Sequence, residues 1–164
     1  MGSASTERDQ TSELVRTAPG QVGRWLPVVL WASVIWTFST GWFDGAGTGG
    51  FLLPLLGVLL PFLDPDGLEW IHQALRKTAH LVEFAILALL LARALDRPER
   101  SWIWLGVTTV GGCLLWAAVD EVHQSFVPTR VGALQDVILD TAGAGVGFLV
   151  YRWRGISSDR RSPA

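Results

Sequence analysis

The segment "TAHLVEFAILALLLARAL" at residues 78–95 is almost continuously apolar and close in length to a membrane-crossing helix. The hydrocarbon core of a bilayer is about 30 Å thick, so an α-helix needs roughly 20 residues to cross it. The composition of the 164-residue chain agrees, because 49% of the residues are hydrophobic, only 17% are charged, and nine are Trp. Soluble domains carry about 25% charged residues, and Trp gathers at membrane interfaces. The sequence therefore predicts an all-α membrane protein.

Three further apolar segments have enough length to cross a bilayer, and with residues 78–95 they predict a bundle of four transmembrane helices. These segments are residues 25–43, 101–124 and 133–151. A fifth apolar stretch, residues 51–63, is too short to cross and is interrupted by Pro54 and Pro61. It predicts an interfacial or re-entrant segment between the first two spans.

The predicted membrane domain covers residues 25–152, between a disordered polar tail at 1–24 and a basic polar tail at 153–164. A cleaved signal peptide is the alternative interpretation of the first span. The long preceding tail and the lack of a small-residue cleavage site favour an uncleaved span. Before the second span, Asp66 and Glu69 have the spacing of a capping box, which predicts a helix that begins near Gly67.

The placement of Lys and Arg predicts that both termini are cytoplasmic, because basic residues stay on that side of the membrane. Of the 13 basic residues, ten lie in the two tails or flank the short loop at 96–100. The three that fall on the predicted outer side are Arg76, Lys77 and Arg130.

Three predicted spans carry ionisable side chains on one helical face near their outer ends. Each such group inside a membrane costs roughly 2.5–3.5 kcal/mol, so this one-sided placement predicts that the groups meet in one polar site. Gly143 and Gly147 continue the face of the fourth span and predict close approach of another helix. The ionisable and amide-bearing groups are Arg76, Lys77, His80 and Glu83 on the second span, Asp120, Glu121, His123 and Gln124 on the third, and Asp136 and Asp140 on the fourth.

The residue types indicate chemistry for this site. His80 is a side chain that exchanges protons near neutral pH, and a desolvated carboxylate is a candidate general base. Arginine holds phosphate or carboxylate groups by a two-pronged contact. The candidate catalytic residues are His80, Glu83, Asp120, Glu121 and Asp136; the candidate substrate-binding residues are Lys77, Gln124 and Arg130; Asp140, Gly143 and Gly147 are further members of the site.

A structural interpretation competes for several of these residues. Asp120 and Glu121 can pair with Arg130 as an ion pair that ends the span, and Arg76 can extend toward lipid head groups. His80 can be a hydrogen-bonded packing residue. The acids and His80 are suitable metal ligands, but no HExxH or comparable spacing occurs, so no metal site is assigned. The cofactor is left open, and the single Cys113 excludes an internal disulfide or a zinc–cysteine site.

The motifs "RKTAHLVEF" (76–84) and "DEVHQSFVPTRVGALQDVILDTAGAGVG" (120–147) resemble the VanZ family of small four-span membrane proteins. The chain departs from the family pattern at Phe84, where Tyr is common, at Thr129, where Gly is frequent, and at Asp140, where Asn is usual. The matching positions are Phe38, Ser39, Lys77, His80, Glu83, Asp120, Glu121, Gln124, Phe126, Pro128, Arg130, Asp136 and Gly143. The resemblance implies a role in the cell envelope and a relation to glycopeptide (teicoplanin) resistance in the member that names the family. It does not imply that this chain confers resistance.

Two function classes stay open at this point. One is an envelope-facing enzyme or binder that acts on a lipid-linked or phosphate- or carboxylate-bearing substrate. The other is a non-enzymatic binding or assembly factor whose charges form a structural network. A transporter is disfavoured because the inner halves of the spans lack ionisable groups. The expected partners are membrane lipids, including a lipid-linked cell-wall precursor. Nucleic acid is excluded by the absence of a basic, aromatic-rich patch, and the oligomeric state is left open.

Overall fold

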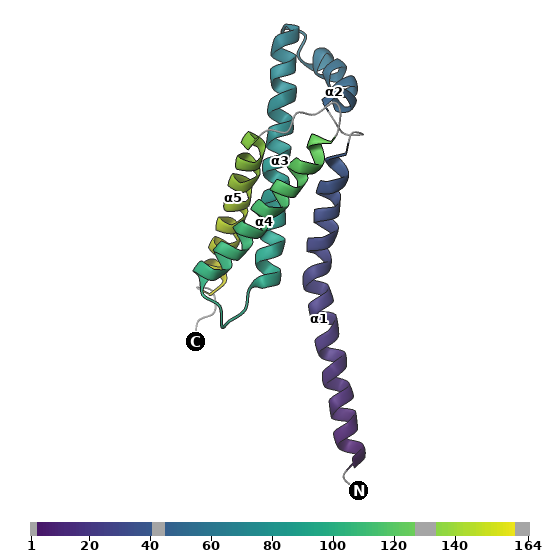
Figure 1. Cartoon of the computed structure of the whole chain (residues 1–164), viewed down its shortest axis with the longest axis vertical. Helices are drawn as coiled ribbons and strands as arrows, with labels where there is room; N and C mark the ends of the chain where they lie inside the picture. The colour runs from purple at the N-terminus through teal and green to yellow at the C-terminus, as the bar shows by residue number, and fades with distance from the viewer. Residues whose placement is uncertain (1–2, 41–44, 127–133, 160–164) are drawn as a thin grey trace.

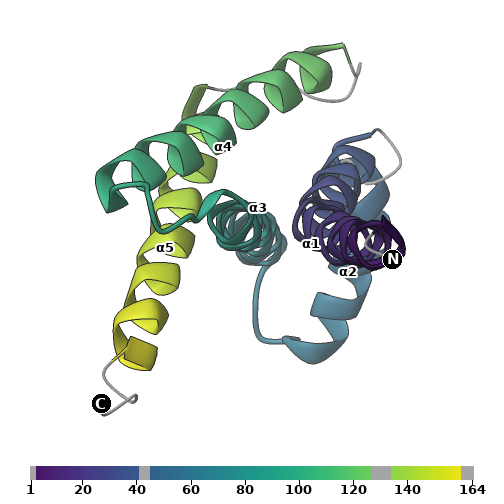
Figure 2. The same ribbon diagram turned by 90° about the horizontal axis from the view of Figure 1, so that it is seen from below.

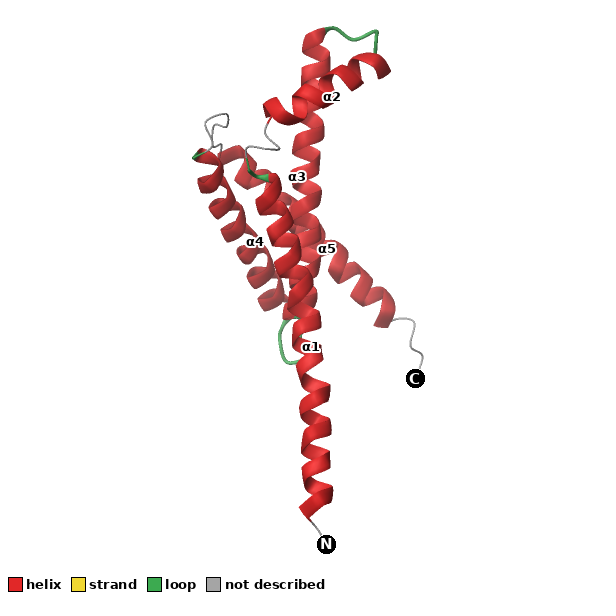
Figure 3. Cartoon of the chain, turned by 90° about the vertical axis from the view of Figure 1, so that its right-hand side faces the viewer, coloured by secondary structure: helices red, strands yellow, loops and turns green. Residues whose placement is uncertain are grey.

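The computed structural model describes residues 3–40, 45–126 and 134–159, and every regular element in these ranges is an α-helix (Figures 1 and 3). The elements are α1 (Ser3–Phe38), α2 (Gly45–Leu59), α3 (Pro65–Leu95), α4 (Trp102–Ser125) and α5 (Leu134–Asp159). The predicted all-α class is therefore confirmed for the described part of the chain.

The start of α3 differs slightly from the prediction. Asp64, not Asp66, is the N-cap, and its Oδ1 accepts a hydrogen bond from the Gly67 backbone N–H at 2.8 Å. Pro65 follows as the first helical residue, where its missing N–H costs nothing and its fixed φ suits the helix. Asp66 lies in the first turn, where its charge is favourable to the helix dipole.

The later helices begin at signals that the sequence contains. Ser101 caps α4, and its Oγ accepts a hydrogen bond from the Trp104 N–H at 3.2 Å. This helix agrees with the predicted span at 101–124 to within one residue.

The two tails differ from the prediction, because α1 already begins at Ser3 and α5 continues to Asp159. Helical hydrogen bonds are local, and the N-terminal tail contains good helix formers such as Glu7, Gln10 and Leu14. Figure 1 shows the N-terminal part of α1, in purple, projecting beyond the other helices.

The helix α3 is the centre of the bundle and packs against each of the other four helices. Seen from below, it lies between α1 on one side and α4 with α5 on the other (Figure 2). The shared core is formed by apolar side chains of four helices, among them Ile35, Phe84, Ala88, Cys113 and Ala144. The first part of α3 extends beyond α4 and α5 and carries α2 beside it (Figure 1).

The closest approach in the bundle joins α5 to α3 through glycines. A Cβ atom placed on Gly143 would collide with the Leu81 carbonyl group, and one on Gly147 would collide with the Ala85 carbonyl group. The two backbones can meet only because both positions lack a side chain. The structure thus agrees with the close approach predicted for this face.

Within the described residues, two helices, α3 and α4, are long and apolar enough to cross a membrane. Only 28% and 22% of their most apolar windows are buried inside the bundle. A core helix of a soluble protein would hide most of that surface, whereas these helices present it outward. The short apolar helix at Gly49–Leu59 cannot cross. These features favour a membrane protein.

Candidate functional site

Side chains from three helices and from the residue that follows α1 meet in a polar cluster, and the same region contains the beginning of α5. We define this polar cluster as Ser39, His80, Asp120, Gln124 and Asp140. Ser39 directly follows α1, while the other members lie on α3, α4 and α5. Ser39, Asp120 and Asp140 are 2%, 1% and 3% exposed. Burial of ionisable groups at this level is costly without partners, so the contacts within the cluster decide its chemistry.

Asp120 accepts two hydrogen bonds on the same carboxylate oxygen. The Ser39 hydroxyl donates to Oδ2 at 2.6 Å, and Gln124 Nε2 donates to it at 2.8 Å. The Gln124 amide also lies 3.2 Å from the Ser39 Oγ, which closes a three-membered network. The second oxygen, Oδ1, is buried and has no hydrogen-bond partner among the described residues. One half of this carboxylate is therefore held in place, and the other half is available as an acceptor.

The second part of the cluster is a pair between α3 and α5. His80 Nδ1 lies 3.6 Å from Asp140 Oδ1, a distance at which the two attract if the imidazole is protonated. The carboxylates of Asp120 and Asp136 are near enough to act electrostatically on Asp140. Gly143 packs on the backbone of Leu81, which brings the facing turns of the two helices together. The glycine contact therefore positions the imidazole beside the buried acid.

Aromatic side chains of α1 lie next to the cluster. The rings of Trp36 and His123 are stacked, with centroids 4.0 Å apart and an interplanar angle of 23°. The rings of Trp36 and Trp116 also lie side by side, with their centroids 6.0 Å apart. One helical turn earlier, Trp31 Nε1 donates a hydrogen bond to the Glu83 carbonyl oxygen at 2.9 Å. These contacts fix the last turns of α1 against α3 and α4.

The structure brings together four residues that the sequence predicts for one site: His80, Asp120, Gln124 and Asp140. Asp136, Glu83 and Glu121 are half-buried, and each of the two glutamates takes part in an interaction. Lys77 is exposed. Arg130, the predicted anion-binding residue, lies outside the described residues. The catalytic and binding roles of all these residues stay predictions.

Sequence reasoning placed His123 on the polar face of the third span but did not assign Ser39 or Trp36 to the site, although Ser39 and Phe38 match the family pattern. Trp36 and Ser39 lie three residues apart, so they share a helical face. That spacing was the only local signal, and it does not say which helix the face meets.

No group of three or more His, Cys, Asp or Glu side chains in the described residues has the arrangement of a metal site.

The arrangement defines a class: an all-helical membrane protein with buried acids gathered near one end of its bundle. Residues 24–155 match the family described as VanZ/LLP1, and the chain belongs to this family. The matched region includes every member of the polar cluster. No curated protein matches the chain, and no solved structure does.

Proposed function

We propose that this VanZ/LLP1 family member is a multi-pass protein of the cell envelope whose polar cluster binds the head group of a lipid-linked substrate. The observation that carries the proposal is Oδ1 of Asp120, a buried carboxylate oxygen that lacks a hydrogen-bond donor among the described residues. It lies in one cluster with Asp140, whose Oδ1 is 3.6 Å from the His80 Nδ1. A buried acceptor without a donor costs about 1–3 kcal/mol, and a bound ligand with hydroxyl or amino groups would supply the missing donors.

The substrate class follows from this need for donors. A bare phosphate ester offers only acceptors and would face the acids unfavourably. A head group that combines a phosphate with a sugar or an amine supplies donors to Asp120 and Asp140. Its phosphate would then be left for the predicted cations, Lys77 and Arg130. We therefore favour a lipid-linked phosphate that bears an amino sugar or a comparable hydroxylated group.

The proposed topology has four spans, formed by the second half of α1 and by α3, α4 and α5. Apolar side chains of α1 and α5 that point away from the bundle support the two spans that are less apolar overall. Val29 and Leu30 are each 58% exposed, Ile138 is 62% exposed and Leu149 is 67% exposed. Lipid is the solvent that such a surface favours.

Hydrogen bonds at the opposite end of the bundle support the orientation. Arg93 donates to the Gly23 carbonyl oxygen at 2.9 Å, and the Arg24 guanidinium lies 3.4 Å from the Asp96 carbonyl oxygen. The Tyr151 hydroxyl donates to the Asp96 carboxylate at 2.7 Å. The beginning of the first span, the end of the second and the end of the last therefore meet where the basic residues gather. That end is cytoplasmic by the distribution of charge, and the polar cluster then faces the outer leaflet.

A structural network is the second candidate function, and one observation favours it. The bonds that join Ser39, Asp120 and Gln124 connect α1 to α4 and would fix the packing of these helices without any ligand. Under this alternative, removal of an acid lowers the stability of the protein and does not change the binding of the lipid probes.

The test uses the full chain in lipid nanodiscs and two probes: a polyprenyl pyrophosphate that carries an amino sugar, and a polyprenyl phosphate without one. Binding is measured by native mass spectrometry, and turnover by chromatography of the extracted lipid. Asp120→Asn and Asp140→Asn should weaken binding of the sugar-bearing probe by about tenfold to a hundredfold, as expected for a hydrogen bond to a charged group. Thr109→Val, which removes another buried oxygen of α4, is the matched control.

Unchanged binding in both acid variants, together with a lowered melting temperature, would leave the structural network as the better account. Equal binding of the two probes by the wild-type chain would contradict the proposed role of the head-group donors.

A further inference from the structure

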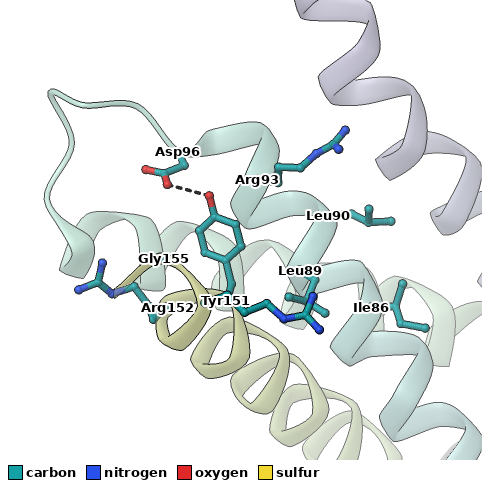
Figure 4. Close-up of a pocket in the computed structure, with 9 residues that line it drawn as sticks. Ile86, Leu89, Leu90, Arg93, Asp96, Tyr151, Arg152 and Gly155 are labelled. Atoms are coloured by element: carbon teal, nitrogen blue, oxygen red, sulfur yellow. Dashed lines mark hydrogen bonds between the residues drawn. The ribbon is translucent and has the colours of Figure 1, made fainter. Parts of the chain in front are cut away.

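A pocket lies at the opposite end of the bundle from the polar cluster, between the end of α3 and the end of α5 (Figure 4). Its volume is about 610 Å³, within the range of about 300–1,000 Å³ that is usual for small-ligand sites. One wall is apolar and is formed by Ile86, Leu89 and Leu90 of α3. The pocket also has three cations, Arg93, Arg152 and Arg154. It therefore combines an apolar wall with a basic end.

The charge of the pocket is positive on balance. Asp96 is the acid that lines it, and the Tyr151 hydroxyl donates a hydrogen bond to that carboxylate at 2.7 Å (Figure 4). A further cation is close, because the Arg24 guanidinium lies 3.4 Å from the Asp96 carbonyl oxygen. Several guanidinium groups around one partly engaged carboxylate attract an anion, and arginine suits phosphate in particular.

The position of the pocket indicates which kind of anionic ligand it can bind. The apolar wall belongs to α3, which is long and apolar enough to cross a membrane, and the cations lie near the ends of two helices, Arg93 on α3 and Arg152 and Arg154 on α5. A ligand that fills the pocket must therefore place apolar chain along the helix and negative charge at its end. Basic pockets between helices at the cytoplasmic face of a membrane bind anionic lipid head groups for the same reason.

We propose that this pocket binds the phosphate head group of an anionic phospholipid from the leaflet at the end of the bundle where Arg93 and Tyr151 lie. Arg152 and Arg154 contact the phosphate, and an acyl chain lies against Ile86, Leu89 and Leu90. The proposal rests on the membrane placement described under the proposed function, but it does not depend on what the polar cluster binds.

The experiment titrates phosphatidylglycerol into the full-length, detergent-solubilised protein and follows bound lipid by native mass spectrometry. Phosphatidylcholine, whose zwitterionic head group has no net charge, is the lipid reference, and inorganic phosphate is the soluble reference. The double variant Arg152→Gln/Arg154→Gln should bind phosphatidylglycerol about thirtyfold more weakly, the effect expected for two lost charges near a membrane surface. Its matched control is Arg97→Gln/Arg100→Gln, which removes two charges from the neighbouring loop without changing the lining of the pocket.

A second pair of variants tests whether the ligand occupies the volume of the pocket, independently of the charge of its arginines. This test stays valid even if the arginine variants do not fold. Gly155 lines the pocket, and a side chain would meet no atom within 4 Å of its Cβ. Gly155→Phe should therefore obstruct lipid binding while the fold is kept. Gly145→Phe places the same side chain on the same helix outside the pocket, also without an atom within 4 Å of its Cβ.

The expected result is weaker phosphatidylglycerol binding in Arg152→Gln/Arg154→Gln and in Gly155→Phe, with near wild-type binding in both controls and in Asp140→Asn. Equal losses in the two arginine pairs would mean non-specific attraction and would overturn the proposal. Equal binding of phosphatidylcholine would do the same. Displacement of the lipid by equimolar inorganic phosphate would identify a soluble phosphate compound as the ligand and would also overturn it. Because Asp140→Asn tests the polar cluster, failure here is distinguishable from failure of the proposed function.

Discussion

Ser39 and Asp120 lie 81 residues apart in the sequence, and their side chains share a buried hydrogen bond of 2.6 Å. The bond fixes the end of α1 against α4 within the polar cluster. It also determines which carboxylate oxygen of Asp120 is occupied and which is left for another donor.

The first prediction concerns this bond. Ser39→Ala should lower the free energy of unfolding by about 1.5–3 kcal/mol, the range for a hydrogen bond to a charged group. In an Asp120→Asn background the same change should cost clearly less, because neighbouring side chains are not additive. Thermal melting in detergent measures both values. The control is Ser33→Ala, since Ser33 is exposed and its hydroxyl donates to the Val29 carbonyl oxygen of its own helix at 2.9 Å. Equal costs of Ser39→Ala in the two backgrounds would contradict the coupling.

The second prediction concerns the glycine contact between α5 and α3. Gly147→Ala should destabilise the protein by about 1–3 kcal/mol, because its methyl group would overlap the Ala85 carbonyl group. Gly145→Ala, two residues away with no atom within 4 Å of its Cβ, should instead stabilise the protein by about 0.8–1 kcal/mol through helix propensity. Melting temperatures that shift in the same direction for both variants would argue against the close contact.

The third prediction concerns a buried hydroxyl. Thr109 is fully buried in α4, and its Oγ1 has no hydrogen-bond partner among the described residues. Thr109→Val keeps the shape of the side chain and removes the unpaired oxygen, so it should raise stability by about 1 kcal/mol. The midpoint of thermal unfolding measures the change. A marked loss of stability would mean that the hydroxyl has a partner in the membrane-embedded protein, such as a bound lipid or ligand.

The fourth prediction concerns Arg130, which lies outside the described residues. From the sequence we expect it to couple with Glu121, so Arg130→Ala combined with Glu121→Gln should cost less than the sum of the single changes. Arg130→Lys separates two roles, because a structural ion pair tolerates lysine in part, whereas planar recognition of phosphate does not. Melting temperature and binding of the sugar-bearing lipid are the readouts. Strict additivity in both would show that the two groups do not meet.

The fifth prediction concerns topology. A fluorescent protein that becomes fluorescent only in the cytoplasm should be active when it is fused after Ala164. A phosphatase that is active only after export should be inactive at the same position. The reason is the gathering of basic residues at the end of the bundle where α1, α3 and α5 are joined by hydrogen bonds. The reverse activities would place the polar cluster on the cytoplasmic side.

Much of the fold was predictable because its signals are local. Apolar runs with the length of a span and a capping Ser101 define α4 almost to the residue. The faces of the helices also follow from their period, which is why His80, Asp120 and Asp140 were expected to meet. The error at Asp64 and Asp66 was small, because the two acids lie two residues apart, one as the N-cap of α3 and the other in its first turn, with Pro65 as the first helical residue between them.

Contacts between segments that lie far apart in the sequence were less predictable. Helical period gives the face on which Ser39 and Trp36 lie, but the neighbouring helix is set by tertiary packing. The basic pocket is a similar case. Tyr151 ends an apolar run in the sequence, and its bond to Asp96, 55 residues earlier, needs the folded chain to become visible.

One consequence of the uninterrupted course of α3 concerns the thickness of the membrane. His80 and Arg93 lie on this single helix, thirteen positions apart, which corresponds to an axial separation of about 20 Å. The hydrocarbon region of a typical bilayer measures about 30 Å. With Arg93 at the inner boundary, the imidazole lies on the order of 10 Å beneath the outer one. A head group reaches that depth most easily where the bilayer is locally thin, at a cost of a fraction of a kcal/mol per Å of mismatch. Acyl-chain length in the surrounding membrane should therefore regulate access to the polar cluster.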